Sequence, residues 1–341
     1  MAGQGQAAEN QHYVPKLILR NFLQNEDKEQ VSVLSKSRKR EFITSIKNIM
    51  AERRFNEFRV NEDFLASFED TASKLEGEVA PIYSKIVETR RLPQCAQQKA
   101  LIAIFVAFQF VRTRGFRDQF KFFDEQLKEK IESTGGKMED VKGYEPLTED
   151  TLKKQHLGFI KESLENFASL IADKDFFLME PPEGRSFYLG DNPVCLHNSS
   201  EQKGPYGNIG LAVRGIEIYC PLSHNLCLAA WCPTIVDQLR RNIAMNRRHI
   251  AQLTLSPSAV QHGDHRVISE IKALSAKLES YLSKIESDNP IALDGENMDF
   301  LNTLQVGTAR EFLICKSGSF KLARDFIDKE GVGDGRWMTF G

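Results

Sequence analysis

The first side chain that could do chemistry lies close to the start of the chain, in Gln-His-Tyr-Val-Pro at residues 11–15. A histidine with its ordinary pKa of about 6.5 can act as a general base, a general acid or a metal ligand. Pro15 suits the first position of a helix, because it has no N–H to leave unpaired and its φ is already near helical. His12 would then lie just before a helix N-terminus. The alternative is a structural role, in which His12 caps that helix or packs against Tyr13.

A second cluster is formed by Gln109, Arg112 and Thr113, which lie within one turn of an otherwise apolar segment. Gln109 and Arg112 are three residues apart and share a helix face. A buried guanidinium is costly unless it meets a carboxylate or an anionic ligand, so Arg112 needs a partner. Two kinds of partner are open: Glu76 or Glu78 in an internal salt bridge, or the phosphate or carboxylate of a ligand in a cleft.

The third cluster is Asp191 and Asn192, which end a predicted strand just before Pro193. Asp and Asn before proline commonly make local hydrogen bonds in turns, and that is one interpretation. The other is functional, because strand ends and loops on a rigid scaffold are where reactive groups tend to lie.

The fourth cluster is a pair of amides, Asn302 and Gln305, three residues apart on one face of a predicted helix. Ala309 extends that face as a small residue, so the helix can come close to a neighbour. The two amides are explained equally well by hydrogen bonds in helix packing and by contact with a ligand.

Helices and strands must position these clusters, and the apolar spacing predicts both. Helical periodicity covers residues 61–88 and 94–131, and part of the second segment is apolar nearly all round, which is typical of a buried helix. Short apolar runs predict strands mainly in 176–231, with short strands near 31–35 and 312–316. Helices followed by strands and again by helices indicate an α+β fold, largely helical with a small mixed or antiparallel sheet.

The same pattern predicts one α+β domain over residues 11–325. Its helical part covers about 11–172, and its sheet-containing part covers about 176–315. We expect a flexible N-terminus over residues 1–10 and a tail over residues 326–341.

Composition narrows the class of protein. The 341 residues include 45 Lys and Arg and 47 Asp and Glu, and the resulting net charge of −2 gives no general attraction to nucleic acid or membrane. No apolar run is long enough to span a bilayer, no signal peptide is evident, and the six cysteines show no close-spaced pair. We therefore expect a cytoplasmic protein with no membrane partner. The phosphate-binding, dinucleotide-binding and nucleophile-elbow motifs are absent from the sequence, which removes the usual support for those enzyme classes.

The four clusters together resemble the bacterial family catalogued as domain of unknown function 4238. The matching segments are Gln-His-Tyr-Val-Pro at 11–15, Leu-Arg-Asn-Phe at 19–22, Arg-Thr at 112–113, Asp-Asn-Pro at 191–193, Pro-Leu at 221–222, and Asn302, Gln305 and Ala309. The resemblance covers residue 11 to about 315 and implies that these segments belong to one domain and converge on one site. It implies no activity. Gly190 departs from the family, which has Ser or Thr before the Asp, and this changes a hydroxyl contact near Asp191.

If the clusters converge, His12 would be a base or ligand, and Asp191 and Glu78 would be carboxylates that hold a divalent metal such as Mg²⁺. The expected catalytic residues are thus His12, Asp191 and Glu78. The expected substrate-binding residues are Arg112, Gln109, Asn192, Asn302 and Gln305. Metal-activated water and an arginine that stabilises developing charge suit the hydrolysis of a phosphodiester.

The sequence-based hypothesis is therefore a metal-assisted hydrolase of nucleic acid or nucleotides, such as a toxin or a phage-defence effector. The alternative is a non-catalytic binding or protein-interaction module, whose buried polar residues tie the helices to the sheet. The two alternatives differ in what the four clusters contact, and the sequence leaves both open. It also leaves the oligomeric state open.

Overall fold

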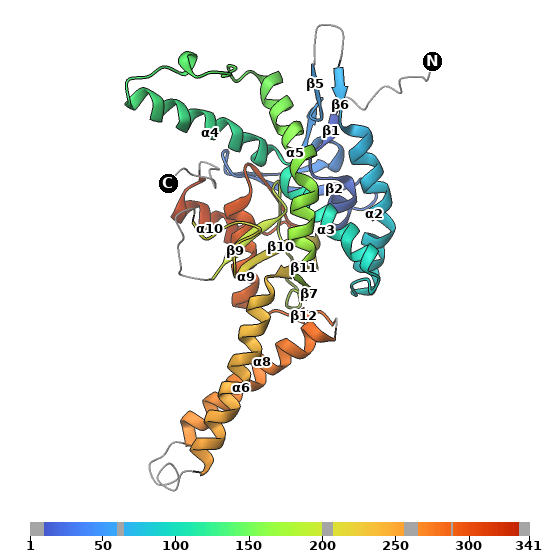
Figure 1. Cartoon of the computed structure of the whole chain (residues 1–341). Helices are drawn as coiled ribbons and strands as arrows, with labels where there is room; N and C mark the ends of the chain where they lie inside the picture. The colour runs from blue at the N-terminus through green and yellow to red at the C-terminus, as the bar shows by residue number, and fades with distance from the viewer. Residues whose placement is uncertain (1–9, 60–64, 200–206, 256–264, 288, 334–341) are drawn as a thin grey trace.

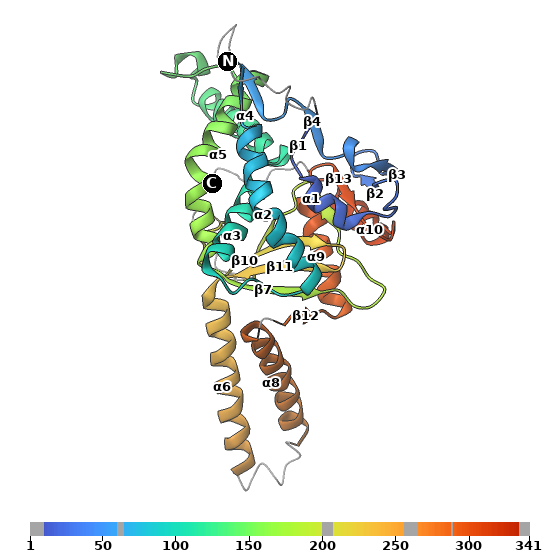
Figure 2. The same ribbon diagram turned by 90° about the vertical axis from the view of Figure 1, so that its right-hand side faces the viewer.

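Helices and small sheets form one body, from which two long helices project as an arm (Figures 1 and 2). This arrangement confirms the predicted α+β class. The computed structural model describes residues 10–59, 65–199, 207–255, 265–287 and 289–333. Most of the predicted flexible N-terminus, residues 1–9, and the end of the predicted tail, residues 334–341, lie outside the described residues.

The larger sheet has five strands and lies at the centre of the body. Their spatial order is β12 (Ile291–Ala292), β7 (Asp175–Glu180), β11 (Leu226–Trp231), β10 (Ile216–Ser223) and β9 (Cys195–Asn198). β12 is parallel to β7, and the other neighbours are antiparallel. All eight residues of β10 are buried, as expected for an inner strand covered on both faces. The prediction of strands in 176–231 is therefore confirmed, and four of them, β7, β9, β10 and β11, lie in this mixed sheet.

The second sheet brings together segments that are far apart in the sequence. Its strands, in spatial order, are β3 (Arg40–Ser45), β2 (Gln30–Ser35), β13 (Phe312–Ile314) and β8 (Leu189–Gly190), all antiparallel. Both predicted short strands are present, and they pair with each other. Two further pairs are β1 (Asn10–His12) with β4 (Ala51–Arg53), and β5 (Glu57–Arg59) with β6 (Leu65–Ser67).

The helices lie close to their predicted positions, with two differences. The α-helices are α1 (Lys16–Leu19), α2 (Glu69–Thr89), α3 (Ala96–Val111), α4 (Arg114–Ser133), α5 (Glu149–Ala172), α6 (Pro233–Leu255), α8 (His265–Glu286), α9 (Gly295–Thr308) and α10 (Lys321–Glu330), and 3₁₀ turns cover Arg20–Phe22, Ile46–Asn48 and Met138–Asp140. The segment predicted as one helix over 94–131 is two, because Thr113 caps α4: its Oγ1 accepts a hydrogen bond from the N–H of Phe116 at 3.2 Å. The helix predicted from residue 61 begins at Glu69, after a short strand. Within the described residues, no helix is both long and apolar enough to cross a membrane.

Strand alternation divides the apolar side chains between two layers. Phe176 and Leu178 on β7 join the main core with α2, α3 and α5, whereas their neighbours Phe177 and Met179 join a second core with α8 and α9. This is the period of two that a pleated strand imposes. A third core, under α9 and α10, covers the four-stranded sheet. The sheet strands thus fix where the polar residues at their ends can lie.

Candidate functional site

His12 is held in a structural contact at the edge of the body. It is the last residue of β1 and pairs with Ala51 of β4. Its Nε2 lies 2.8 Å from the carbonyl oxygen of Ile46, and partial burial lowers the pKa of its ring. A neutral imidazole with Nε2–H donating to that carbonyl satisfies both observations.

Arg112 forms an internal salt bridge, which was one of the two predicted possibilities. Its side chain is 2% exposed, and its Nη1 pairs with Glu76 of α2. Its Nη2 donates to the carbonyl oxygen of His12 at 2.5 Å, and its guanidinium lies 4.5 Å from the ring centre of Phe108. Arg112 therefore connects α2, α3 and the N-terminal strand.

Two sequence candidates near Arg112 have different surroundings. Glu78 is exposed on α2 and makes no contact with His12 or Arg112 among the described residues. Gln109 is fully buried on α3, and neither of its amide atoms has a hydrogen-bond partner in the described part of the chain. An unpaired buried amide costs about 1–3 kcal/mol per lost hydrogen bond, so Gln109 marks a strained point of the core.

Asp191 follows β8 and binds the segment that leads into the neighbouring strand β13. Its carboxylate accepts backbone N–H bonds from Arg310 at 2.7 Å, from Glu311 at 2.9 Å and from Phe312 at 3.1 Å. Burial raises the pKa of this carboxyl group, while the three N–H donors and the nearby Lys36 oppose that rise. Both carboxylate oxygens are engaged, but with residues about 120 positions away and not with the local turn that was one of the two interpretations. Asp191 instead fixes the start of β13.

The amides of Asn302 and Gln305 bind the backbone of one extended segment. Asn302 Oδ1 accepts from the N–H of Tyr188 at 2.8 Å, and its Nδ2 donates to the carbonyl oxygen of Ser186 at 3.2 Å. Gln305 Oε1 accepts from the N–H of Gly190 at 2.8 Å, and its Nε2 donates to the carbonyl oxygen of Pro193 at 2.9 Å. Two alternatives were predicted for these amides, helix packing and contact with a ligand, and the hydrogen bonds found are those of helix packing. The two amide side chains therefore hold α9 against residues 186–193.

Two glycines allow this close packing. A Cβ on Gly115 would lie 2.1 Å from Nδ2 of Asn192, which itself donates to the carbonyl oxygen of Thr308 at 2.8 Å. A Cβ on Gly190 would lie 3.0 Å from the Cβ of Ala309. Gly190, where the family resemblance predicted a hydroxyl residue, therefore lies against α9 with little room for a side chain.

A pocket of about 380 Å³ lies where these segments meet. Arg38 from the turn between β2 and β3, Arg114 from the start of α4, and Arg310 from the connection between α9 and β13 line it. We call this the arginine pocket. Tyr13 and Asp191 also line it, so the first and third sequence clusters do meet here, although through the neighbour of His12. His12 and Arg112 are absent from its lining.

The charges around the arginine pocket are only partly neutralised. Arg310 pairs through Nε with Asp118, and Arg114 lies 3.8 Å from a carboxylate oxygen of Glu52. Arg38 is exposed and makes no ion pair with another described residue. The free N–H groups of these guanidiniums, together with the positive end of the α4 dipole, favour an anion.

The other polar groups of the pocket are neutral donors or are already paired. Tyr13 is 3% exposed, and burial, with Asp191 nearby, raises the pKa of its hydroxyl well above 10. Tyr13 therefore stays protonated. The carboxylate of Glu311 accepts hydrogen bonds from Ser35 at 2.5 Å and from Ser37 at 2.9 Å.

Two residues that line the arginine pocket lie one or two positions from predicted site residues in the sequence. Tyr13 follows His12, and Arg114 follows Arg112 and Thr113, within the same quoted motifs. β1 ends at His12, and the chain bends at Tyr13, which is buried and lines the pocket, whereas His12 is only partly buried and does not line it. Arg38 lies in the basic run at residues 36–40, and a charged run of this kind is typical of a solvent-exposed turn, so nothing in the sequence marks Arg38 as a site residue.

The predicted magnesium ligands do not fit a metal site in this arrangement. Within the described residues, no three His, Cys, Asp or Glu side chains are grouped as metal ligands could be. The His12 ring is hydrogen-bonded to the carbonyl oxygen of Ile46. The carboxylate oxygens of Asp191 already accept backbone N–H bonds, which a metal ion would have to displace. We therefore derive no step through a metal.

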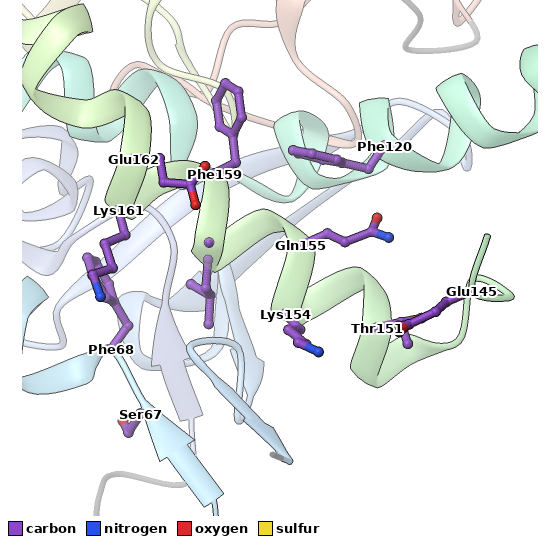
Figure 3. A pocket seen from close by; sticks show the side chains of 12 residues that line it. Ser67, Phe68, Phe120, Glu145, Thr151, Lys154, Gln155, Phe159, Lys161 and Glu162 are labelled. Carbon is purple, nitrogen blue, oxygen red and sulfur yellow. The ribbon is translucent and has the colours of Figure 1, made fainter. Parts of the chain in front are cut away.

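Two larger pockets contain none of the predicted site residues. Figure 3 shows one of about 610 Å³ beside α5, where Lys154, Lys161 and Glu162 are spread along the helix, Glu145 lies on the loop before it, and the four do not converge on one point. The other, of about 700 Å³, lies between α4 and α5 and is lined mainly by phenylalanine and aliphatic side chains. Neither pocket presents a set of converging charged groups.

Comparison with known proteins gives a family and nothing more specific. No curated protein and no solved structure matches the chain. The model of one family, described as protein of unknown function (DUF4238), matches residues 10–319, which include every segment around the arginine pocket. The chain therefore belongs to the DUF4238 family.

Proposed function

We propose that the protein binds a nucleotide in the arginine pocket. The observation that carries this proposal is the meeting of Arg38, Arg114 and Arg310, from three distant segments, at one pocket. Guanidinium groups match the geometry of phosphate oxygens, and a neutral tyrosine hydroxyl can add a further hydrogen bond. A volume of about 380 Å³ is in the range of small-molecule sites.

Two aromatic rings at the same pocket favour a nucleotide over inorganic phosphate. Phe42 and Phe312 line the pocket, with ring centres 6.5 Å apart in an edge-to-face arrangement. Both side chains are only partly buried, so part of each ring is exposed. A base that stacks on one of them would gain about 1–3 kcal/mol.

Binding without catalysis is the form of this function that the contacts support best. A hydrolase needs a group that activates water, and His12 and Asp191 already have protein partners for the atoms they would use. Glu78 is exposed on a different element. Hydrolysis of nucleotides or nucleic acid, and a role as toxin or phage-defence effector, stay predictions from the sequence.

Calorimetric titration with adenosine monophosphate, adenosine and inorganic phosphate tests the proposal. We expect saturable binding of the nucleotide, weaker binding of phosphate, and weaker binding still of the nucleoside. Arg38→Gln should raise the Kd for the nucleotide about tenfold, because it removes charge-assisted hydrogen bonds without breaking an ion pair. Titration of an oligonucleotide with a 5′-phosphate distinguishes a nucleic-acid end from a free nucleotide as the source of the phosphate.

Arg40→Gln is the matched control. Arg40 is exposed on β3, two residues from Arg38, and it does not line the pocket. The proposal fails if no nucleotide binds, or if Arg38→Gln and Arg40→Gln bind it equally well.

A further inference from the structure

The arm is a pair of helices with an apolar seam of its own. α6 leaves the body after β11 and α8 returns before β12 (Figures 1 and 2). Apolar residues at alternating spacings of three and four recur along α8, at Val267, Ile271, Leu274, Leu278, Tyr281 and Ile285. This spacing is typical of a coiled-coil seam, but Val267 and Leu274 are 46% and 52% exposed, so the stripe is only partly buried in the arm. With 23 residues, α6 is about 35 Å long, so most of the arm lies beyond the cores of the body.

The charge of the arm differs from that of the whole chain. The chain has a net charge of −2, but α6 and α8 carry eight Lys or Arg and only four Asp or Glu. The imbalance is strongest on α6, which has no Asp or Glu after Asp237, and the sequence has none until Asp264. Four arginines lie in this acid-free stretch. A net basic helix pair on a slightly acidic protein predicts an anionic partner.

The four arginines of α6 divide into two pairs with different surroundings. Arg240 pairs with Asp237 and Glu286, and Arg247 pairs with Glu279 of α8. Their neighbours Arg241 and Arg248 are exposed and make no ion pair or hydrogen bond with other described residues. Arg241 and Arg248 are seven residues apart, so they share a face and lie about 10 Å apart along the helix.

Four other large side chains are exposed beside Arg241 and Arg248, of which three are polar and one is a methionine. Asn242, Met245, His249 and Gln252 are exposed between or beside Arg241 and Arg248. Amide, imidazole and guanidinium groups are those that contact phosphate and sugar in protein–nucleic acid complexes. Met245 is the only large apolar side chain among them, and it is 64% exposed.

We propose that the outer face of α6, through Arg241 and Arg248, binds the phosphate backbone of a nucleic acid. The guanidiniums of Arg241 and Arg248, which have no ion-pair partner among the described residues, match the charge of that backbone, and α6 has no Asp or Glu after Asp237. An anionic membrane fits less well, because a helix that lies in a membrane interface needs an apolar face, and this one offers Met245 alone. This inference goes beyond the proposed nucleotide pocket and involves a different surface.

Fluorescence anisotropy with labelled DNA and RNA duplexes, each in a series of salt concentrations, tests this inference. In Arg241→Gln/Arg248→Gln, we expect weaker duplex binding and a slope of log K against log salt concentration that is smaller by about two, because two phosphate contacts are removed. Glutamine preserves helix propensity, so α6 should stay folded. Circular dichroism checks this.

The control is Arg91→Gln/Lys121→Gln, which removes two positive charges from exposed positions outside the arm. It should keep both affinity and slope. The inference is overturned if the wild type does not bind either duplex, if the control loses as much affinity as the arm variant, or if the wild type prefers phosphatidylserine vesicles to duplexes.

The two proposals can fail separately. Arg38→Gln should keep duplex binding, and Arg241→Gln/Arg248→Gln should keep nucleotide binding. If duplex binding depends on Arg38 and not on the arm arginines, the arm inference is wrong while the nucleotide pocket stands.

Discussion

At the scale of single residues, several charged or titratable groups are buried in the core and satisfied there. Arg117 is 4% exposed, lies 3.7 Å from the ring centre of Phe55, and donates to Phe55 O at 2.7 Å. Its Nε donates to Nδ1 of His156 at 3.1 Å, and the other ring nitrogen of His156 lies 2.7 Å from Val111 O. His156 must therefore be neutral, with its proton on Nε2.

This contact predicts a pH dependence of stability. Burial, with the nearby Arg117, lowers the pKa of His156 to about 3. In the unfolded chain the pKa is about 6.5, so below that value the unfolded state takes up a proton that the folded state refuses. The stabilisation is present above pH 6.5 and is lost as the pH falls toward 3.

Urea unfolding of the wild type and of His156→Gln measures this effect. Between pH 7 and pH 5, the wild type should lose about 2 kcal/mol more of its unfolding free energy than the variant loses. Each protein is compared with its own value at pH 7, so a constant cost of the substitution does not matter. Equal losses in the two proteins would show that His156 is not held neutral.

At the scale of elements, contacts between segments matter more than the propensity of each segment. α4 starts at Arg114 because Thr113 caps it, and Gly115 then lets the side chain of Asn192 lie against the first turn. Helical periodicity alone runs through this break, since apolar residues continue on both sides of it. The contact that requires a glycine at position 115 is with Asn192, which is 77 positions away in the chain.

Gly115→Ala should therefore destabilise the protein, whereas the same change at Gly77 should not. An added methyl at Gly115 meets an amide that is held by the carbonyl oxygen of Thr308, and overpacking of this kind costs about 1–3 kcal/mol. Gly77, on α2, has nothing within 4 Å of the added Cβ, so the change there should stabilise the helix by about 0.5–1 kcal/mol. Urea denaturation of both variants gives the comparison. A loss at Gly77, or none at Gly115, would contradict it.

At the scale of the whole molecule, the strand pairing determines which motifs meet. The apolar runs predicted the strands, but nothing local indicated that β13 would lie between β2 and β8. That pairing carries Arg310 and Asp191 to the turn that holds Arg38. The sequence therefore predicted the elements and several residues beside the pocket, and it could not predict the convergence of the three arginines.

The buried motif residues and the arginine pocket have complementary roles at this scale. Arg112, Asp191, Asn302 and Gln305 bind backbone or internal partners, so they set the relative positions of the N-terminal strand, α3, α9 and β8. The side chains that remain available to a ligand are their neighbours, Tyr13, Arg38, Arg114 and Arg310. The matched family segments thus build a frame around the arginine pocket.

A crystal structure of the protein with bound adenosine monophosphate tests this account most directly. The account predicts phosphate density within hydrogen-bond distance of Arg38, Arg114 and Arg310, and a base against Phe42 or Phe312. A nucleotide whose phosphate lies in the pocket of Figure 3, or is held by His12 and Arg112 while the arginine pocket stays empty, would contradict it.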